Sequence, residues 1–369
     1  MLTSLAFTPG FATPESPTKN FVPNHSLNVK TAVPKLYGLA GPGFYFPTPQ
    51  SNVSVIAIDG ATGEVTPVGD EWPNHSFSEG SSTLSGSVFS FITLDKTGID
   101  PHTTALPCLL ASQDVTTGAK LPVATLPYTA SIFSAGGAQC VTAAADGSGD
   151  VFVVSSELGD KPGQRYLSRV STADGKVDSK LVPSGGVGGP FGVSCAHDPK
   201  ADKLWFATCS QDASIGKPCS FSAIDAKTGG VTDVLKTDIR CQILHLSYDA
   251  TTNALVGTGS LSPQCAGEVA VFSAPLDAVP TPAQGQPAPK WTFPVHAMPS
   301  DSGGTPYVNV GCATQGSAFT FLSKNVPATS PGVIGADATT GKVTFEWEAL
   351  KVNGATHDFM MPIALSLEC

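Results

Sequence analysis

The chain has 369 residues, of which only 14% are charged, and it contains 38 Gly and 31 Pro. This composition argues against a helical protein and favours many short strands joined by turns. A formal net charge of −10 disfavours nucleic acid or an anionic lipid surface as partner, and no apolar run is long enough for a membrane helix.

The first part of the chain predicts an irregular arm over residues 1–34, followed by a single domain over residues 35–369. The start lacks the basic and apolar segments of a signal peptide, so if the protein is secreted we expect the chain to be a mature form with an added Met. Residues 36–40, 53–58 and 64–68 predict strands two to four of an opening sheet. Its first strand is expected from Phe359–Leu367, which would close a ring; the alternative first strand is Leu27–Val33.

A hairpin of the form Asp-x-x-Thr-Gly recurs along the chain. It occurs at Asp59–Gly63, Asp114–Gly118, Asp225–Gly229 and Asp337–Gly341, with a variant at Ser171–Gly175. The closing glycines lie 55, 57, 54 and 112 residues apart, and 112 is twice 56, so one corner is missing where Pro275–Pro289 inserts a Pro-rich loop. Such a period, with four short strands in each unit, predicts a β-propeller.

The repeat therefore predicts an all-β fold, a six-bladed β-propeller of four-stranded antiparallel blades. The blades are expected at residues 35–70 completed by 359–367, 76–126, 132–183, 190–236, 241–295 and 305–349. The core is expected between neighbouring sheets, since each sheet is too small to bury both of its faces alone.

Nine cysteines are many for a cytosolic chain. Cys209 and Cys219 bracket one loop and predict a hairpin disulfide, and Cys241 with Cys265 predicts a second bridge on the same face. The cysteines at equivalent places on three first strands are interpreted as small buried apolar residues, because neighbouring blades should hold them too far apart: Cys140, Cys195 and Cys312. Cys108 and Cys369 remain unassigned, and an odd count leaves at least one thiol outside these bridges.

Three Asn-x-Ser sequons, at Asn24, Asn52 and Asn74, accompany these cysteines. Together they predict a secreted, extracellular glycoprotein, with a cytoplasmic protein as the alternative.

The loops that lead into the first strands are the expected site, because a propeller holds loops rigidly around its centre. The candidate ligand-binding residues are His75, Glu79, Arg240, His245, His296, Asp301, Tyr307, His357 and Asp358. His75, His296 and His357 could bind a divalent metal such as Ca²⁺ or Zn²⁺, or act as general bases. The other interpretation is that these are solvated loop residues, since their spacing matches no ligand signature.

Two family resemblances follow from the hairpins. Ala57–Gly63, Ala223–Gly229 and Ala336–Lys342 with Trp347 resemble the A-x-D-x-x-T-G repeat of quinoprotein-type propellers, which implies the hairpin but not a quinone cofactor. Six blades resemble the gluconolactonase-like and NHL-type propellers. The first of these families holds a calcium ion with Glu, Asn and Asp, and the resemblance implies Glu79, Asn309 and Asp358 as the positions to consider.

These features lead to two main functional hypotheses. The first is a secreted binding module that recognises a protein or glycan through its loop face. The alternative is a metal-dependent hydrolase or lactonase with its site at the channel mouth. A third role, in an extracellular assembly, would use residues 1–34 as a contact segment.

Overall fold

A computed structural model describes most of the chain beyond its first 34 residues. The described residues are 35–42, 52–59, 64–98, 105–131, 138–156, 165–182, 195–208, 218–240, 243–260, 269–281, 287–297, 305–314, 317–323, 331–347, 351–352, 355–356 and 363–368. The chain divides into two compact units, Met1–Ala32 and Val33–Cys369. The first unit, and with it the predicted arm and the alternative strand Leu27–Val33, lies outside the described residues.

The second unit is a β-propeller, as its repeat predicts, with five four-stranded blades rather than the six expected. In chain order, blade B holds β5 (His75–Ser85), β6 (Val88–Asp95), β7 (Ala105–Asp114) and β8 (Ala124–Ser131); blade E holds β9 (Ala138–Ala143), β10 (Val151–Ser156), β11 (Arg165–Val170) and β12 (Val177–Val182); blade F holds β13 (Cys195–Asp198), β14 (Lys203–Thr208), β15 (Pro218–Asp225) and β16 (Val231–Arg240). Blade G holds β17 (Ile243–Asp249), β18 (Ala254–Ser260), β19 (Val269–Pro275) and β20 (Val295–Ala297), with the 3-10 turn η2 (Leu276–Ala278); blade H holds β21 (Thr305–Thr314), β22 (Ser317–Ser323), β23 (Pro331–Asp337) and β24 (Val343–Trp347).

The remaining large sheet differs from these blades because it has five strands drawn from both ends of the unit. It holds β27 (Ile363–Glu368), β1 (Leu36–Pro42), β2 (Asn52–Ile58), β3 (Val65–Pro67) and β4 (Trp72–Pro73). The short β3 ends at Pro67 and β4 continues along β2; proline has no N–H to extend an edge ladder. A two-stranded hairpin, β25 (Lys351–Val352) with β26 (Ala355–Thr356), forms a small sheet of its own beside β3.

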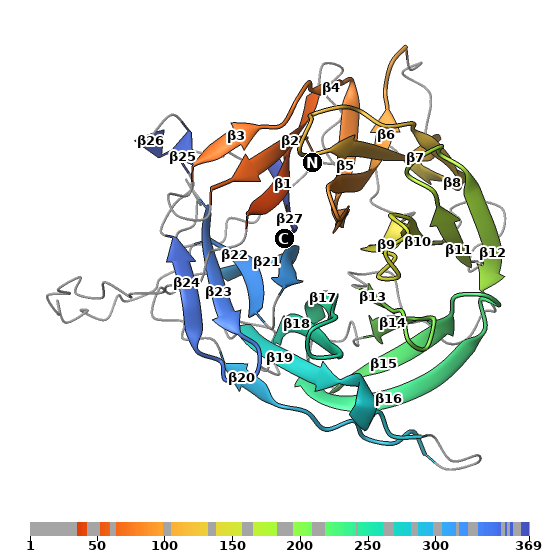
Figure 1. Ribbon diagram of the computed structural model, residues 1–369, viewed down its shortest axis with the longest axis vertical. Helices are drawn as coiled ribbons and strands as arrows, with labels where there is room; N and C mark the ends of the chain where they lie inside the picture. The colour runs from red at the N-terminus through yellow and green to blue at the C-terminus, as the bar shows by residue number, and fades with distance from the viewer. Residues whose placement is uncertain are drawn as a thin grey trace, which may run out of the picture. The chain divides into compact units, whose positions relative to one another are not determined.

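The C-terminal strand closes the ring, as expected. β27 pairs antiparallel with β1, with Gly38 opposite Leu367. The innermost strand of each sheet contacts that of the next, in the order β5, β9, β13, β17, β21 and β27, and β27 contacts β5 again (Figure 1). The terminal sheet therefore has no free inner edge.

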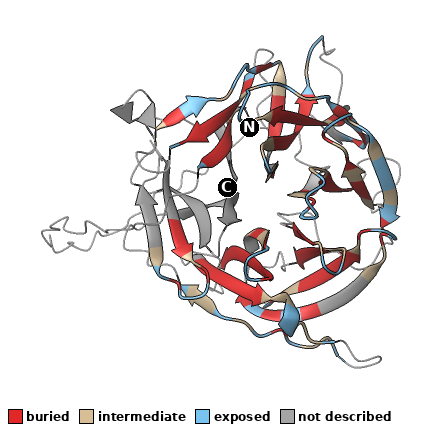
Figure 2. Ribbon diagram, in the orientation of Figure 1, coloured by how far each residue is buried: buried red, intermediate tan, exposed pale blue. Residues whose placement is uncertain are grey.

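The hydrophobic core lies between neighbouring sheets, where Figure 2 shows buried residues along the strands. One cluster between blades F and G gathers Trp205, Phe221, Phe272 and Trp291, with Phe293 packed against it. The ring centroids of Trp205 and Trp291 are 5.5 Å apart, and those of Phe221 and Trp291 are 5.4 Å apart.

The Asp-x-x-Thr-Gly corners are alike wherever they are described. At Asp225, Oδ1 accepts hydrogen bonds from the Thr228 N–H at 2.7 Å and the Thr228 hydroxyl at 2.9 Å, and the Gly229 N–H returns to the Asp225 carbonyl. The same bonds recur at Asp337. The closing Gly229 has a φ of +74°, which glycine adopts without strain. Thus the repeated residues build one turn geometry.

The closing glycine also contacts the sheet before it. A Cβ on Gly229 would lie 3.0 Å from the carbonyl oxygen of Leu181, and one on Gly118 would lie 2.9 Å from Cα of Gly69. The glycine is therefore needed both for its turn and for close packing between sheets.

Blade G lacks this corner, and its fourth strand departs from the prediction. The sequence places the end of this blade at residue 295, with its fourth strand expected over Lys290–Val295, but β20 covers Val295–Ala297. The preceding residues join blade F instead: the Lys236 N–H bonds the Pro289 carbonyl at 2.9 Å, and the Trp291 N–H bonds the Lys236 carbonyl at 2.8 Å. Trp291 is thereby held in the seam that a corner glycine occupies elsewhere.

A disulfide joins Cys140 of β9 to Cys195 of β13, with 5.8 Å between the two Cα atoms. The expectation that equivalent cysteines on neighbouring blades are too far apart was wrong, because innermost strands converge toward the centre of the ring. Cys219 is also disulfide-bonded. Its predicted partner Cys209, and Cys241 and Cys265, lie outside the described residues, so those pairings stay predictions.

Candidate functional site

The propeller has two ends with different connections. In each blade the first-to-second and third-to-fourth strand turns emerge at one end, here named the corner face. The second-to-third connections and the links between blades emerge at the other end, here named the loop face. A polar cluster on each face could serve as a site.

On the corner face the two turns of a blade are bonded to each other. In blade B the Val115 N–H donates to the Ser87 carbonyl at 2.7 Å, and in blade F the Ala226 N–H donates to the Asp202 carbonyl at 2.9 Å. Blade G has the matching bond, from the Leu276 N–H to Asn253 at 3.0 Å. In blade E the Thr172 hydroxyl donates to the Gly149 carbonyl at 3.0 Å. This arrangement fixes the corner face in these four blades.

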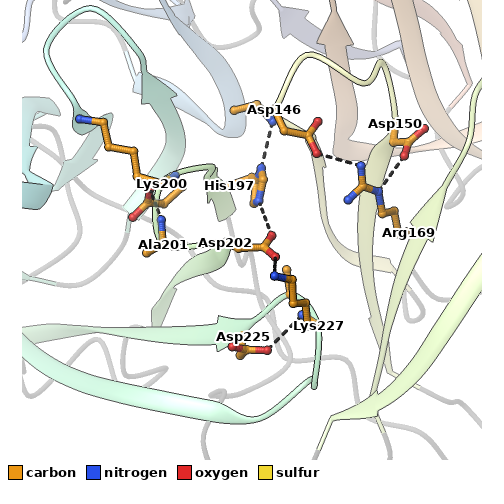
Figure 3. Close-up of polar contacts among 12 residues, drawn as sticks. Asp146, Asp150, Arg169, His197, Lys200, Ala201, Asp202, Asp225 and Lys227 are labelled. Carbon is orange, nitrogen blue, oxygen red and sulfur yellow. Dashed lines mark hydrogen bonds and ion pairs between the residues drawn. The ribbon is translucent and has the colours of Figure 1, made fainter.

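A charged cluster of the corner face lies between blades E and F (Figure 3). His197, on β13, has a side chain that is only 1% exposed. Its Nδ1 accepts a hydrogen bond from the Ala145 N–H at 3.0 Å, and its Nε2 lies 3.3 Å from Oδ1 of Asp202. Since the amide can only donate, Nδ1 is unprotonated, and the neutral ring carries its proton on Nε2 and donates it to Asp202.

Arg169, on β11, completes the cluster on the blade E side. Its Nε bonds Asp150 at 2.7 Å, and its Nη2 bonds Asp146 at 2.8 Å and the Ser148 hydroxyl at 3.1 Å. The guanidinium lies 5.4 Å from the ring centroid of Phe152, and the ring centroids of Phe152 and His197 are 4.8 Å apart. The pKa of Asp146 falls to about 2: burial opposes the shift, but the bonds from Ser148 and Arg169 outweigh it.

This cluster has the residue types of an acid–base site, but its histidine is not free to bind a substrate. Burial above all lowers the pKa of His197, and Arg169 adds to that effect, whereas the hydrogen bond and charge of Asp202 oppose it. Both ring nitrogens are committed to bonds within the protein, so the ring offers no free lone pair to a substrate.

Blade G repeats this device without histidine. Tyr248 occupies the place of His197, and its hydroxyl donates to Oδ1 of Asn253 at 3.2 Å. Asn253 and Asp202 both have positive φ, +50° and +53°, and both close the first turn of their blade. The His197–Asp202 pair therefore matches a structural pair of the neighbouring blade, which favours a clamp over catalysis.

On the described part of the loop face, polar and charged side chains gather where the terminal sheet leads into blade B. His75 opens β5, lies opposite Asp95 of β6, and donates from Nδ1 to the Pro73 carbonyl at 2.7 Å. The pKa of Asp95 is lowered: burial opposes the shift, but donors from Thr97 and the nearby His75 outweigh it. Lys96 follows in the turn, with its N–H bonded to the Asn74 carbonyl at 2.8 Å.

The other predicted site residues are scattered over the described strands. His245 is on β17, an innermost strand; its Nε2 lies 2.5 Å from the Ser247 hydroxyl, and burial lowers its pKa to about 3. His296 is on β20, the outermost strand of blade G, under the closing Gly341 of blade H. His75 therefore lies on an innermost strand and His296 on an outermost strand, so the structure separates these two candidates.

Strands also hold three further candidates, Glu79 on β5, Arg240 on β16 and Tyr307 on β21. Asp301, His357 and Asp358 lie outside the described residues. Within the ranges given above, no three His, Cys, Asp or Glu side chains gather closely enough to hold a metal ion.

Sequence reasoning did not single out Lys96 or the partners of Arg169. A signal existed for the second group: Asp146-Gly-Ser-Gly-Asp150 alternates polar side chains with glycines in left-handed conformation, φ +78° and +81°. Such a turn gathers its oxygens on one side. Nothing in the sequence around Lys96 distinguishes it from a surface lysine.

No protein-family model and no curated protein sequence matches the chain. Among solved structures, it is similar to the periplasmic gluconolactonase of Pseudomonas aeruginosa, with 12% identity, 90% of this chain and 99% of that chain covered, and a TM-score of 0.44. It is also similar to the β-propeller domain of the Trilobed protease from Pyrococcus furiosus, with 9% identity, 83% and 80% covered, and a TM-score of 0.42.

An acylaminoacyl peptidase is a further similar structure, with 10% identity and a TM-score of 0.43; 84% of this chain but only 43% of the peptidase is covered. Likenesses this distant concern the fold alone. The propeller fold itself stands on the sheets described above. None of the helical turns in the described ranges is long and apolar enough to cross a bilayer.

Proposed function

We propose that the protein is a secreted binding module that recognises a protein or glycan through its loop face. The observation that carries this proposal is that the two corner-face turns of blades B, E, F and G are hydrogen-bonded to each other. The polar groups of the corner face are therefore used to hold the fold. Recognition then falls to the loop face, whose connections the ring positions rigidly.

The histidines support binding over acid–base chemistry. His197 bonds through both ring nitrogens, His245 bonds Ser247, and Nδ1 of His75 is used by Pro73. The disulfide between Cys140 and Cys195 supports an oxidising, extracellular setting. Asn52, the exposed residue that opens β2, is the sequon position we propose for glycosylation.

A metal-dependent hydrolase or lactonase is the second candidate. It is favoured by the placement of His75 and His245 on innermost strands, the part of a propeller that surrounds its centre, and by the burial that keeps His245 in the neutral form a metal ligand needs.

The test is a binding screen by surface plasmon resonance against purified oligosaccharides and purified extracellular proteins. It uses wild type, a loop-face variant, His75→Ala with Lys96→Met, and a corner-face control, Lys200→Met. Saturable binding that is lost only in the loop-face variant supports the binding module. Binding lost only in the corner-face control, or no saturable binding at all, contradicts it.

Metal analysis of the same preparations addresses the second candidate. A stoichiometric divalent ion that disappears in His357→Ala, together with lactone hydrolysis that follows the metal content, would replace the binding module by the enzyme.

A further inference from the structure

Lys96 has an unusual position for a surface lysine. It lies in the turn between β6 and β7, on the loop face, and its backbone N–H ties this turn to Asn74 of the link that enters blade B. Asn74 has a positive φ of +58°, and His75 follows it at the start of β5. Two connections of the loop face therefore meet at Lys96.

The Lys96 ammonium is buried and has no partner. Within the described part of the chain its Nζ makes no hydrogen bond and no ion pair. Other lysines are engaged: Nζ of Lys120 bonds the Glu71 carbonyl at 2.5 Å, and Lys290 pairs with Asp238 at 2.6 Å. The adjacent Asp95 is exposed and accepts from the Thr97 N–H at 2.8 Å.

Such an ammonium is unfavourable by itself, because a charge removed from water needs a counter-charge or several hydrogen bonds. Burial accordingly lowers the pKa of Lys96. A second buried group lies at the same end of the sheet: the hydroxyl of Ser76, the residue after His75, is fully buried and has no partner in the described ranges. Within the described ranges, the Lys96 ammonium is therefore a cation without a counter-charge in blade B.

We propose that Lys96 is the anion-recognition residue of the loop face, and that the group it takes is a carboxylate of the bound partner. This inference rests on the proposed function. A single carboxylate matches a single ammonium in charge. A net charge of −10 disfavours a polyanion with dense charge. The carboxylate can come from an acidic sugar or from a peptide.

The experiment measures binding by calorimetry with four probes: a galactose oligomer that carries one galacturonate residue, the same oligomer without it, a peptide with one glutamate, and the same peptide with glutamine in its place. The variants are Lys96→Met, which keeps the apolar chain without the charge, and Lys96→Arg, which keeps the charge. Lys200→Met is the matched control, an exposed lysine of the corner face.

We expect an acidic probe to bind wild type and its neutral counterpart not to bind. Lys96→Met should weaken that binding at least about tenfold, as loss of a charge-assisted bond in a desolvated site does, while Lys96→Arg and Lys200→Met bind nearly as wild type. Whether the sugar or the peptide binds identifies the source of the carboxylate.

Thermal unfolding without ligand gives an independent readout. If the ammonium is unpaired, Lys96→Met removes a buried charge and raises the melting temperature; a lowered melting temperature would show that Lys96 has a partner within the chain and would overturn the inference.

The two proposals fail differently. Equal binding of an acidic probe to wild type and Lys96→Met, or binding of neutral probes alone, overturns the role of Lys96 and leaves the binding module standing. Failure of every ligand in both screens overturns both.

Discussion

The corner face and the loop face of this propeller differ in how their polar groups are hydrogen-bonded. On the corner face, turns repeat from blade to blade, their carboxylates accept hydrogen bonds within the turn, and neighbouring turns bond each other. On the described loop face, Lys96 and Ser76 have buried polar atoms that the described chain does not match. The turns of the corner face are therefore matched within the chain, whereas these two described groups at the other end are not.

The comparison has one informative exception on the corner side. Blade G has no Asp-x-x-Thr-Gly corner, and its seam with blade F is filled by Trp291. Aromatic packing there replaces a glycine contact and a turn. The four predictions below test the packing and electrostatics of the ring, ordered from the largest to the smallest effect expected at neutral pH.

Trp291→Ala should have the largest effect on stability. The side chain is 1% exposed and lies against Trp205, Phe221 and Phe293. We expect a loss of about 3–5 kcal/mol in the free energy of unfolding, as for other buried aromatic truncations, measured by denaturant titration. Val123→Ala, at an exposed apolar residue, is the control and should change little. A loss below that range would show that the seam is held by something other than Trp291.

Replacing both Cys140 and Cys195 by Ser should follow. The bridge closes a segment with a sequence separation of 55, so its loss should lower stability by about 2–4 kcal/mol. Cys108→Ala, at a buried free cysteine, controls for the loss of a buried sulfur alone. If reduction of the wild-type protein leaves its unfolding unchanged, the bridge does not stabilise the ring.

Gly118→Ala tests the contact between sheets, and Gly86→Ala is its matched control. Both glycines have positive φ, +75° and +61°, but a Cβ would meet Gly69 only from Gly118; Gly86 has open space. Both variants bear the cost of the left-handed backbone. We expect Gly118→Ala to be less stable than Gly86→Ala by about 1–3 kcal/mol, and equal losses would argue against the contact.

The pH dependence of stability should show His245, whose side chain is half-buried and desolvated. Its folded pKa is about 3, below the ordinary 6.5, so the unfolded chain binds the proton more readily. Stability is therefore complete above pH 6.5 and falls as the pH is lowered from 6.5 toward 3, by up to about 1.4 kcal/mol for each pH unit. His245→Asn should flatten this slope in urea titrations at several pH values. An unchanged slope would assign it to other groups.

The fold could be predicted further than the site, for a physical reason. Each Asp-x-x-Thr-Gly corner uses the same hydrogen bonds, so the motif predicts the same turn at Asp225 and at Asp337. The disulfide between Cys140 and Cys195 was missed because strand patterns do not give the distance between neighbouring blades. Strand patterns also failed where Pro289 and Trp291 pair with blade F rather than their own blade.

The site is less predictable because its residues are recognised by which hydrogen bonds they make or lack in the folded chain, and no sequence pattern shows this. Lys96 looks like any turn lysine in the sequence, and only the packing of blade B shows that its ammonium is buried. The sequence shows His197 only as a histidine. Its structural role follows from its bonds to Ala145 and Asp202 and from the equivalent position of Tyr248 in blade G.

Native-state hydrogen exchange at the corner amides tests the division of the two faces most directly. The N–H groups of Val115, Ala226 and Leu276 carry the bonds between turns. If the corner face is structural, these amides exchange only through opening events within about 1 kcal/mol of global unfolding. Exchange as fast as that of an exposed turn would contradict this division.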